Sequence, residues 1–480
     1  MWAQPGSAQA APAQAGAPEV RGTWLTTTAN TALASPAHTA QTMRRLREIG
    51  LNTVYVESWK NGYTQFPSQV LARTIGVAQR PAQAAQDPSD PPGPAPARDL
   101  LQETVIEAHR NGLLHVAWFE YGFMAAHGRT MNHLRRMKPE WLSRDRSGNE
   151  VAPNGFVWMN PLHPQARAFL RDLMLEAIER YDLDGVQLDD RIVWPYVTMG
   201  YDDHTRAVYA AEHGGRQPPD DPREPGWMRW RADKLQALAR SLVAELRAAR
   251  PALFVSLSPA PYPWSWEHYL LEWPKWAGWP VAEGWSEFVP QAYRMSYEAF
   301  ERTWLEQVDE LRQAGTYRAA SLVAGIRVVG DGPDSSWAQL RDSMLLVRRL
   351  GQAGHVLWFS RGVLERFPGE LAGFYAASGP AHSPHFPADW RQPARPLEPA
   401  LGAPAQAAAD GTDGPQRAWR LPPAPAGRYH LIGHDGRSWA ILQALTLPIA
   451  APADGIVHAA ARYGQLELIV DRRGQPRPAR

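Results

Sequence analysis

Short runs of β-branched and other apolar residues alternate with longer amphipathic stretches from residue 19 onward. Runs such as "LNTVYVES" predict strands, and stretches such as "HPQARAFLRDLMLEAIERY" place apolar residues at helical spacing. A series of eight strand–helix units favours a closed parallel (β/α)8 barrel of the α/β class over a doubly wound sheet. The predicted strands span residues 19–27, 51–58, 113–122, 183–190, 252–260, 287–294, 321–328 and 354–360.

Shifts in composition divide the chain into four parts. Residues 1–18 are rich in Ala, Pro and Gln and predict a disordered spacer, and residues 19–376 hold the barrel pattern. Residues 377–415 are rich in Pro and Ala and predict a linker. Residues 416–475 contain β-type runs such as "RYHLIG" and predict a small β-rich accessory domain.

Composition excludes several functional classes. Lys+Arg 50 against Asp+Glu 49 gives a net charge of +1, so no overall field indicates nucleic acid or an anionic membrane as a partner. Cys 0 excludes disulfides, thiolate catalysis and cysteine-bound metals. The chain has no apolar stretch of about 20 residues that could span a bilayer. We expect a monomer.

The N-terminal segment bears on localisation. It has neither the basic start nor the apolar core of an intact signal peptide. Its composition is typical of a spacer that follows a cleaved signal, so we expect an exported protein that is periplasmic, envelope-associated or extracellular. A disordered cytosolic tail is the alternative.

The segment "DGVQLDD" ends the fourth predicted strand with two acids. Because side chains alternate along a strand, Gln187 and Asp189 share one face while Val186 and Leu188 share the other. The apolar pair should face the helices, which directs Gln187 and Asp189 into the barrel mouth. Asp190 then begins the loop at the rim. A helix N-cap or a turn is the structural alternative for each aspartate.

Two further acids end neighbouring strands. Glu120 ends "HVAWFE" at the level of Asp189, and Glu57 ends "TVYVE" one strand earlier. Two carboxylates on adjacent barrel strands are what glycosidic hydrolysis requires, one to protonate the leaving oxygen and one to attack or to activate water. For Glu57, a salt bridge to an arginine inside the mouth is an equal alternative.

The strand ends also supply a polar and aromatic lining. The 21 tryptophans of the chain suit stacking on sugar rings as well as core packing. Together with amide, hydroxyl and guanidinium donors, they indicate a polyhydroxylated ligand rather than a lipid or a nucleotide. The predicted substrate-binding residues are Glu57, Trp59, Asn61, Tyr63, Trp118, Tyr121, Gln187, Arg191, Tyr262, Trp264, Gln291, Tyr293, Arg294 and Trp358.

Motifs for other chemistries are absent from the sequence. No GxGxxG follows the first predicted strand, and the chain has neither a GxSxG elbow nor a P-loop. Asp202, Asp203 and His204 could bind a metal, but they lie in a polar loop and no HExxH spacing occurs. We therefore expect neither a metal nor another cofactor.

Seven motifs in order give a family resemblance over roughly residues 19–375: "EVRGTWLTT", "LNTVYVES", "AWFEYGF", "WMNPLHPQAR", "DGVQLDD", "SLSPAPYPW" and "EFVPQAYR". The chain resembles glycosyl hydrolase-like family 10, which includes a divisome-associated glycosidase that acts on peptide-free peptidoglycan. The resemblance implies a TIM-barrel hydrolase of the bacterial envelope with its catalytic centre at "DGVQLDD".

The same strand is similar to the "DG-aromatic-R-x-D" strand of amylase-type barrels. That similarity implies that Asp189 is the nucleophile and that Gln187 replaces the arginine. Amylases carry their acid on the fifth strand, where "VSLSPA" has none, so the acid role moves to Glu120 or to Asp190.

The resulting hypothesis is that the protein is an exported glycoside hydrolase that acts on an envelope or extracellular polysaccharide. Peptidoglycan glycan strands are the first candidate for this substrate. Asp189 would be the nucleophile or base, Glu120 the general acid and Asp190 a supporting carboxylate. Two alternatives stay open. One is a non-catalytic glycan-binding protein, and the other is a metal-dependent polysaccharide deacetylase or lyase.

Overall fold

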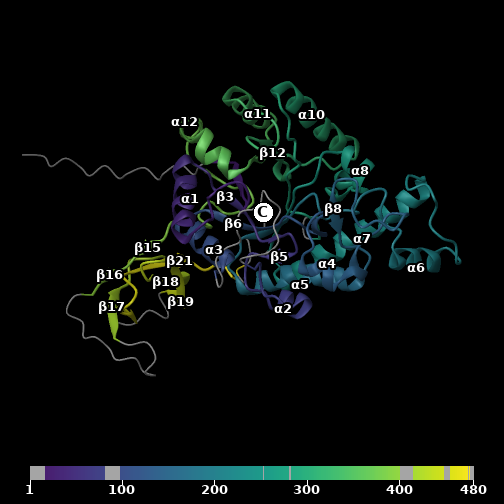
Figure 1. The fold of residues 1–480 in the computed structure, drawn as a ribbon. Helices are drawn as coiled ribbons and strands as arrows, with labels where there is room; N and C mark the ends of the chain where they lie inside the picture. Colours follow the sequence, from purple (N-terminus) through teal and green to yellow (C-terminus); the bar gives the residue numbers. More distant parts are fainter. Residues whose placement is uncertain are drawn as a thin grey trace, which may run out of the picture.

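Eight parallel strands form the barrel of the computed structural model (Figure 1). Their order in the sheet is β11-β10-β9-β6-β3-β2-β13-β12, and the bridges Phe288–Leu322 and Gln291–Gly325 join the last strand to the first. The predicted (β/α)8 barrel is therefore confirmed. The structure describes residues 17–81, 98–251, 253–280, 283–400, 415–447, 455–473 and 475. The barrel strands are β2 (Val20–Leu25), β3 (Thr53–Glu57), β6 (Leu114–Phe119), β9 (Gly185–Leu188), β10 (Phe254–Leu257), β11 (Glu287–Phe288), β12 (Val323–Arg327) and β13 (Gly354–Trp358).

Helices surround the barrel, and their ends follow local capping rules. The first long helix begins after Ser35, whose hydroxyl accepts from the backbone N–H of His38, and it ends at Gly50 in the left-handed region. The long helices of the barrel are α1 (Pro36–Ile49), α3 (Leu100–Arg110), α5 (Pro164–Arg180), α7 (Pro225–Ala249), α10 (Tyr297–Gln313), α11 (Trp337–Arg349) and α12 (Pro368–Ala377). Shorter helices in the connections are α2 (Gln69–Ile75), α4 (His133–Met137), α6 (Asp203–Glu212), α8 (Trp264–Tyr269) and α9 (Trp273–Trp276).

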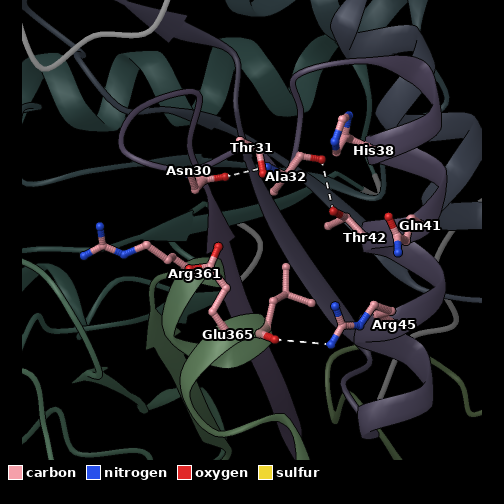
Figure 2. A pocket seen from close by; sticks show the side chains of 10 residues that line it. Asn30, Thr31, Ala32, His38, Gln41, Thr42, Arg45, Arg361 and Glu365 are labelled. Carbon is pink, nitrogen blue, oxygen red and sulfur yellow. Dashed lines mark hydrogen bonds between the residues drawn. The ribbon is translucent and has the colours of Figure 1, made fainter.

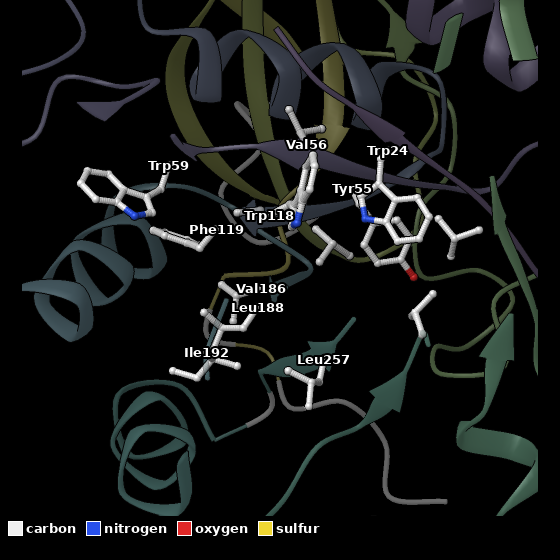
Figure 3. Packing of buried hydrophobic residues seen from close by; sticks show 14 of the residues in the cluster. Trp24, Tyr55, Val56, Trp59, Trp118, Phe119, Val186, Leu188, Ile192 and Leu257 are labelled. Carbon is white, nitrogen blue, oxygen red and sulfur yellow. The ribbon is translucent and has the colours of Figure 1, made fainter. Parts of the chain in front are cut away.

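Large aromatic side chains fill the interior of the barrel. Trp24, Tyr55 and Trp118 are buried, and the Trp24 ring lies 5.9 Å from Tyr55 and 6.4 Å from Trp118. Figure 3 shows these three together, with Val186 and Leu188 of β9 in the same buried cluster. Because indoles are large, a few of them occupy the space that several branched side chains fill in other barrels.

Two small antiparallel sheets follow the barrel and lie beside α1 and α3 (Figure 1). They have their own core, which includes Trp419, Leu431 and Leu466, so the predicted C-terminal β-rich domain is confirmed. Arg110 of α3 joins the two parts, since its Nε donates to Glu467 at 2.7 Å and its guanidinium lies over the Trp439 ring. The strands are β15 (Arg395–Pro396), β16 (Glu398–Pro399), β17 (Gln416–Arg420), β18 (Gly427–His434), β19 (Trp439–Leu447), β20 (Ile456–Ala460) and β21 (Gln465–Val470).

The segment predicted as a linker packs against the barrel over its described first part. Ala381 pairs with Ala17, so β14 (Ala381–His382) and β1 (Ala17–Pro18) form a short parallel sheet. Arg391 is buried and donates to Asp182 and Asp184, which lie just before β9 at the opposite end of the barrel from Asp189. The remaining predicted linker residues, 401–414, and residues 1–16 of the predicted spacer lie outside the described residues.

No helix in the described part of the chain has the length and apolar character needed to cross a bilayer.

Candidate active site

Asp189 lies one residue beyond the end of β9 and is only 3% exposed. Its Oδ2 accepts from Trp118 Nε1 at 3.0 Å and from Arg191 Nη1 at 2.9 Å. Its Oδ1 accepts from the backbone N–H of Asp190 at 2.8 Å and from the side-chain amide of Gln291. Asp189 therefore points inward, as strand parity predicts, but each of its oxygens already holds two donors.

Arg191 lies at the centre of three carboxylates. Its Nη1 is 2.9 Å from Asp189 Oδ2, 3.4 Å from Asp190 Oδ1 and 3.7 Å from Glu120 Oε1. Burial alone would lower the pKa of Arg191, but the attraction of Asp190, Asp189 and Glu120 outweighs burial and raises it. Arg191 therefore stays charged and offsets part of the repulsion among the acids.

The pKa of Asp189 is raised well above its ordinary value. Burial is the largest cause, the charge of Asp190 is the next, and Arg191 opposes both. The charge of Glu120 also raises the Asp189 pKa, so the neighbouring acids both oppose ionisation of Asp189.

Asp190 is the acid of this group that solvent reaches best. Its side chain is 22% exposed, against 9% for Glu120 and 4% for Asp189. Asp190 was expected at the rim, and its side chain lies at the barrel mouth. It can therefore contact a substrate while the hydrogen bonds of Asp189 stay intact. Of the three acids, Asp190 is thus the one most open to a substrate.

Glu57, by contrast, is saturated by partners inside the mouth. Its oxygens accept from the Thr26 and Thr27 hydroxyls at 2.6 Å each, from the Gln65 amide at 2.8 Å and from Lys60 Nζ at 3.2 Å. Burial would raise the pKa of Glu57, but Lys60 and the threonine hydrogen bonds outweigh it and lower the pKa. Glu57 therefore forms a salt bridge inside the mouth, but its partner is Lys60 and not the expected arginine.

Lys60 is the residue that sequence reasoning missed here. Its Nζ lies 3.2 Å from Glu57 Oε2 and 3.6 Å from Glu120 Oε2, so it connects the second and third strands of the barrel. The sequence did contain a sign of this ion pair, because Lys60 is one of only four lysines in the chain and follows Glu57 by three residues.

Tyr293 and Trp358 form an aromatic pair near the acids. Their rings stack at 5.7 Å with an interplanar angle of 27°, and Trp24 meets Tyr293 edge-on at 6.3 Å. Burial and then the charge of Asp189 raise the pKa of Tyr293. Tyr121 belongs to the same region, since the Arg191 guanidinium lies over its ring.

Gln187 lies deeper than expected. It is fully buried, accepts from Trp24 Nε1 at 2.8 Å and donates to the Ser256 hydroxyl at 2.9 Å. Gln187 points inward as predicted, and its oxygen and its nitrogen both bond to the barrel interior. Gln187 thus orders the layer beneath the acids.

Several other predicted lining residues belong to the core or to loop contacts. Trp59 is fully buried and packs on Phe169 of α5, and Figure 3 shows it apart from Trp24 and Trp118. Trp59 lies in β4 (Trp59–Lys60), beyond the end of the barrel strand β3, and its ring turns toward α5. Three more predicted residues bond within their own surroundings, Asn61 to Asn132, Tyr63 to His133 and Arg294 to Thr303.

The β10–β11 connection holds the last two predicted residues. The Tyr262 backbone N–H donates to Gln307 at 2.7 Å, and Trp264 is 43% exposed on α8. Nearby, Tyr269 and Asn154 form a 3.0 Å hydrogen bond that sequence reasoning did not identify. Their only sequence signal was a position in long loops after barrel strands.

A hollow of about 450 Å³ lies between the loop after β2, α1 and the segment after β13 (Figure 2). Arg45 donates to the Leu364 carbonyl at 3.3 Å across it, and Thr42 donates to the Ala32 carbonyl at 3.0 Å. None of the predicted site residues lines this hollow.

A group of possible metal ligands lies at the other end of the barrel. Among the described residues, Asp182, His430 and Asp471 bring ligand atoms close enough for a cation. Arg391 Nη1 already lies 3.0 Å from Asp182 Oδ2, and Arg428 lies 2.9 Å from Asp471 Oδ2. Ion pairs with arginine therefore balance these carboxylates, and the arrangement fits an interdomain contact better than a metal centre.

Comparison with known proteins links this geometry to a family. The model of the family described as Glycosyl hydrolase-like 10 matches residues 19–328. The chain is 27% identical over 169 residues to the glycosyl hydrolase YngK of Bacillus subtilis, covering 35% of this chain and 31% of that protein. It is 22% identical over 277 residues to the glycosyl hydrolase DigH of Escherichia coli, covering 53% of this chain and 58% of that protein. The chain thus spans less than two thirds of the length of these relatives.

Two solved structures share the fold. The glycoside hydrolase domain of PgaB (BpsB) from Bordetella bronchiseptica aligns with a TM-score of 0.55 at 14% identity, covering 75% of this chain and 98% of that domain. The catalytic domain of a β-amylase from Paenibacillus polymyxa aligns with a TM-score of 0.51 at 11% identity, with the same coverages. These alignments support the barrel architecture.

Proposed function

Because the chain belongs to the Glycosyl hydrolase-like 10 family, we propose that it is a glycoside hydrolase that cleaves an envelope or extracellular polysaccharide, with peptidoglycan glycan strands as the first candidate. The observation that carries this proposal is that Asp190 and Glu120 follow neighbouring barrel strands and lie 3.4 and 3.7 Å from the same nitrogen of Arg191. Active sites of such barrels lie at this end.

In this proposal Asp190 is the nucleophile or base and Glu120 is the general acid. Asp189 was expected to be the nucleophile or base. Its two oxygens already accept from four donors, so contact with a substrate would break a buried hydrogen bond. Asp189 instead becomes a positioning residue that holds the Asp190 backbone, the Arg191 guanidinium and the Trp118 indole.

The geometry is compatible with both stereochemical outcomes. Since one Arg191 nitrogen contacts both acids, Asp190 Oδ1 and Glu120 Oε1 lie no more than about 7.1 Å apart. Retaining enzymes separate their carboxyls by roughly 5 to 5.5 Å and inverting enzymes by roughly 6.5 to 9.5 Å. The anomer first released, followed by proton NMR, decides between a covalent intermediate on Asp190 and an activated water.

Export of the protein belongs to the same proposal. It rests on the Ala/Pro/Gln-rich composition of residues 1–18 and on a substrate that lies outside the cytosol. Fractionation of cells that produce the native gene product tests it, and recovery in the cytosol alone would contradict it.

The experiment for activity is digestion of peptide-free glycan strands, with chitin and other polysaccharides in parallel and fragments identified by mass spectrometry. Asp190→Asn and Glu120→Gln should each abolish release of fragments, whereas Asp203→Asn, at an exposed position on α6, should leave it unchanged. Binding without cleavage by the wild type would replace the hydrolase with a glycan-binding protein. Loss of activity on addition of a chelator would favour the metal-dependent alternative.

A further inference from the structure

Four aromatic side chains lie together beside the acids, and we call Tyr196, Trp264, His268 and Tyr269 the aromatic platform. Trp264 stacks on His268 with ring centroids 4.5 Å apart and an interplanar angle of 20°. Tyr269 meets Trp264 edge-on at 5.2 Å and Tyr196 at 5.6 Å. The platform therefore joins α8 to the segment that follows Asp190.

Backbone hydrogen bonds fix the platform relative to the acids. The N–H of Trp194 donates to the Tyr269 carbonyl at 3.1 Å, and the N–H of Val197 donates to the His268 carbonyl at 2.6 Å. Asn154 donates to the Tyr269 hydroxyl from a third segment at 3.0 Å. Because Trp194 follows Asp190 by only four residues, these hydrogen bonds connect the end of α8 to the segment that carries the acid.

The pKa of Tyr269 agrees with this placement of the platform near the acids. Burial raises the pKa of Tyr269 to about 12, and the charge of Asp190 is the next cause. A group that feels Asp190 so directly lies in its vicinity, and its phenol stays neutral throughout the physiological range.

Trp264 is the outward part of the platform. It is 43% exposed, while nine other tryptophans of the described chain rank among its largest fully buried side chains. One face of its indole rests on His268, so the exposed surface is a flat apolar plate, supported from behind, in a connection that follows a barrel strand. Such plates match the C–H face of a pyranose ring, and rigidity lowers the entropy that binding costs.

We infer that the aromatic platform is a binding subsite for a pyranose unit of the polysaccharide beyond the bond that is cleaved. The inference deepens the proposed function, because it makes the substrate a polymer that runs from the acids across Trp264. Glycans long enough to reach Trp264 then bind more tightly than shorter ones, so the enzyme prefers long chains.

The test compares the wild type with Trp264→Ala and Trp264→Phe on peptide-free glycan strands and chitooligosaccharides of graded length. Trp264→Ala should raise KM on long chains by about tenfold, with little effect on kcat and on the shortest chains that are cleaved, and Trp264→Phe should restore most of the loss. Trp230→Ala is the matched control, since Trp230 is also a partly exposed indole stacked on a ring, that of Trp227, but on α7.

An equal effect of Trp264→Ala at every chain length, or no effect, overturns the subsite. If the wild type cleaves none of these glycans, affinity electrophoresis on the same chains separates the two proposals. Retardation of the wild type that Trp264→Ala loses then supports the subsite while the hydrolase fails. Retardation of both proteins, or of neither, overturns the subsite as well.

Discussion

The backbone amide of Asp190 donates to Oδ1 of Asp189 at 2.8 Å, so the first aspartate of the pair holds the second in place. Asp189 is buried with both oxygens occupied, while the Asp190 side chain reaches the mouth. The two adjacent aspartates therefore differ in their access to a substrate. One serves the structure of the site and the other is available for chemistry.

Replacement of the two aspartates should have different kinetic consequences. Asp190→Asn should lower kcat by roughly 10²- to 10⁴-fold at unchanged fold, because it removes a group that acts in the reaction. Asp189→Asn should lower kcat less and also shift the pH–rate profile, since it changes the charge that Asp190 and Arg191 experience. The measurement is kcat over pH for both variants, with circular dichroism as the check on folding. A larger loss of kcat for Asp189→Asn would return Asp189 to the role of nucleophile.

Removal of the shared cation should move the acidic limb of the pH–rate profile. In Arg191→Met, Asp190, Asp189 and Glu120 lose the positive charge at 2.9 to 3.7 Å, which favours their protonated forms. Arg191 lowers the pKa of Asp189, so its loss raises that pKa further, and the full charge of the site forms only at higher pH. The limb should therefore shift upward in pH. Arg216→Met, at an exposed position, serves as the control and should leave the profile in place.

The ion pairs of Glu19 should make the stability of the barrel sensitive to acid. It accepts from Arg348 Nε at 2.6 Å and from Arg21 Nε at 2.7 Å, and although burial opposes it, these partners with His355 lower its pKa from 4.5 to about 2. Because the folded-state pKa is depressed, this stabilisation is present above pH 4.5 and is lost as the pH falls toward 2.

Glu19→Gln should accordingly lower the free energy of unfolding at neutral pH and flatten its decline between pH 4.5 and 2. Urea unfolding followed by circular dichroism across that range measures both effects. Glu48→Gln, on the exposed side of α1, is the matched control. Parallel curves for wild type and Glu19→Gln would contradict the assignment.

Arg391 should stabilise the contact between the barrel and the segment before the C-terminal domain. Its guanidinium donates to Asp184 at 2.8 Å and to Asp182 at 3.0 Å, and all three side chains are buried. Arg391→Met leaves two buried carboxylates with one fewer partner, so it should cost about 3 to 5 kcal/mol of stability. Thermal unfolding measures the loss, and limited proteolysis should cut earlier near residue 400. Arg417→Met, at an exposed position, should show neither change.

Local pattern alone determined the architecture of this protein and the inward direction of Asp189 and Gln187. Alternation of period two in "DGVQLDD" and the series of strand and helix patterns depend on neighbours in the chain, so they can be read without a fold. The same local logic placed Glu120 and Asp189 at corresponding ends of adjacent strands, and the barrel has that strand order.

Tertiary structure decided which of these side chains is open to a substrate. Trp118, Arg191 and Gln291 saturate Asp189 from three separate segments, Lys60 and two threonines saturate Glu57, and Phe169 covers Trp59. Arg191 and Lys60 are near neighbours in sequence, but Trp118, Gln291 and Thr26 are distant partners that meet these acids only when the barrel closes. For that reason the sequence could identify the candidate catalytic carboxylates. Only the packed structure could distinguish Asp190 at the mouth from Asp189 beneath it.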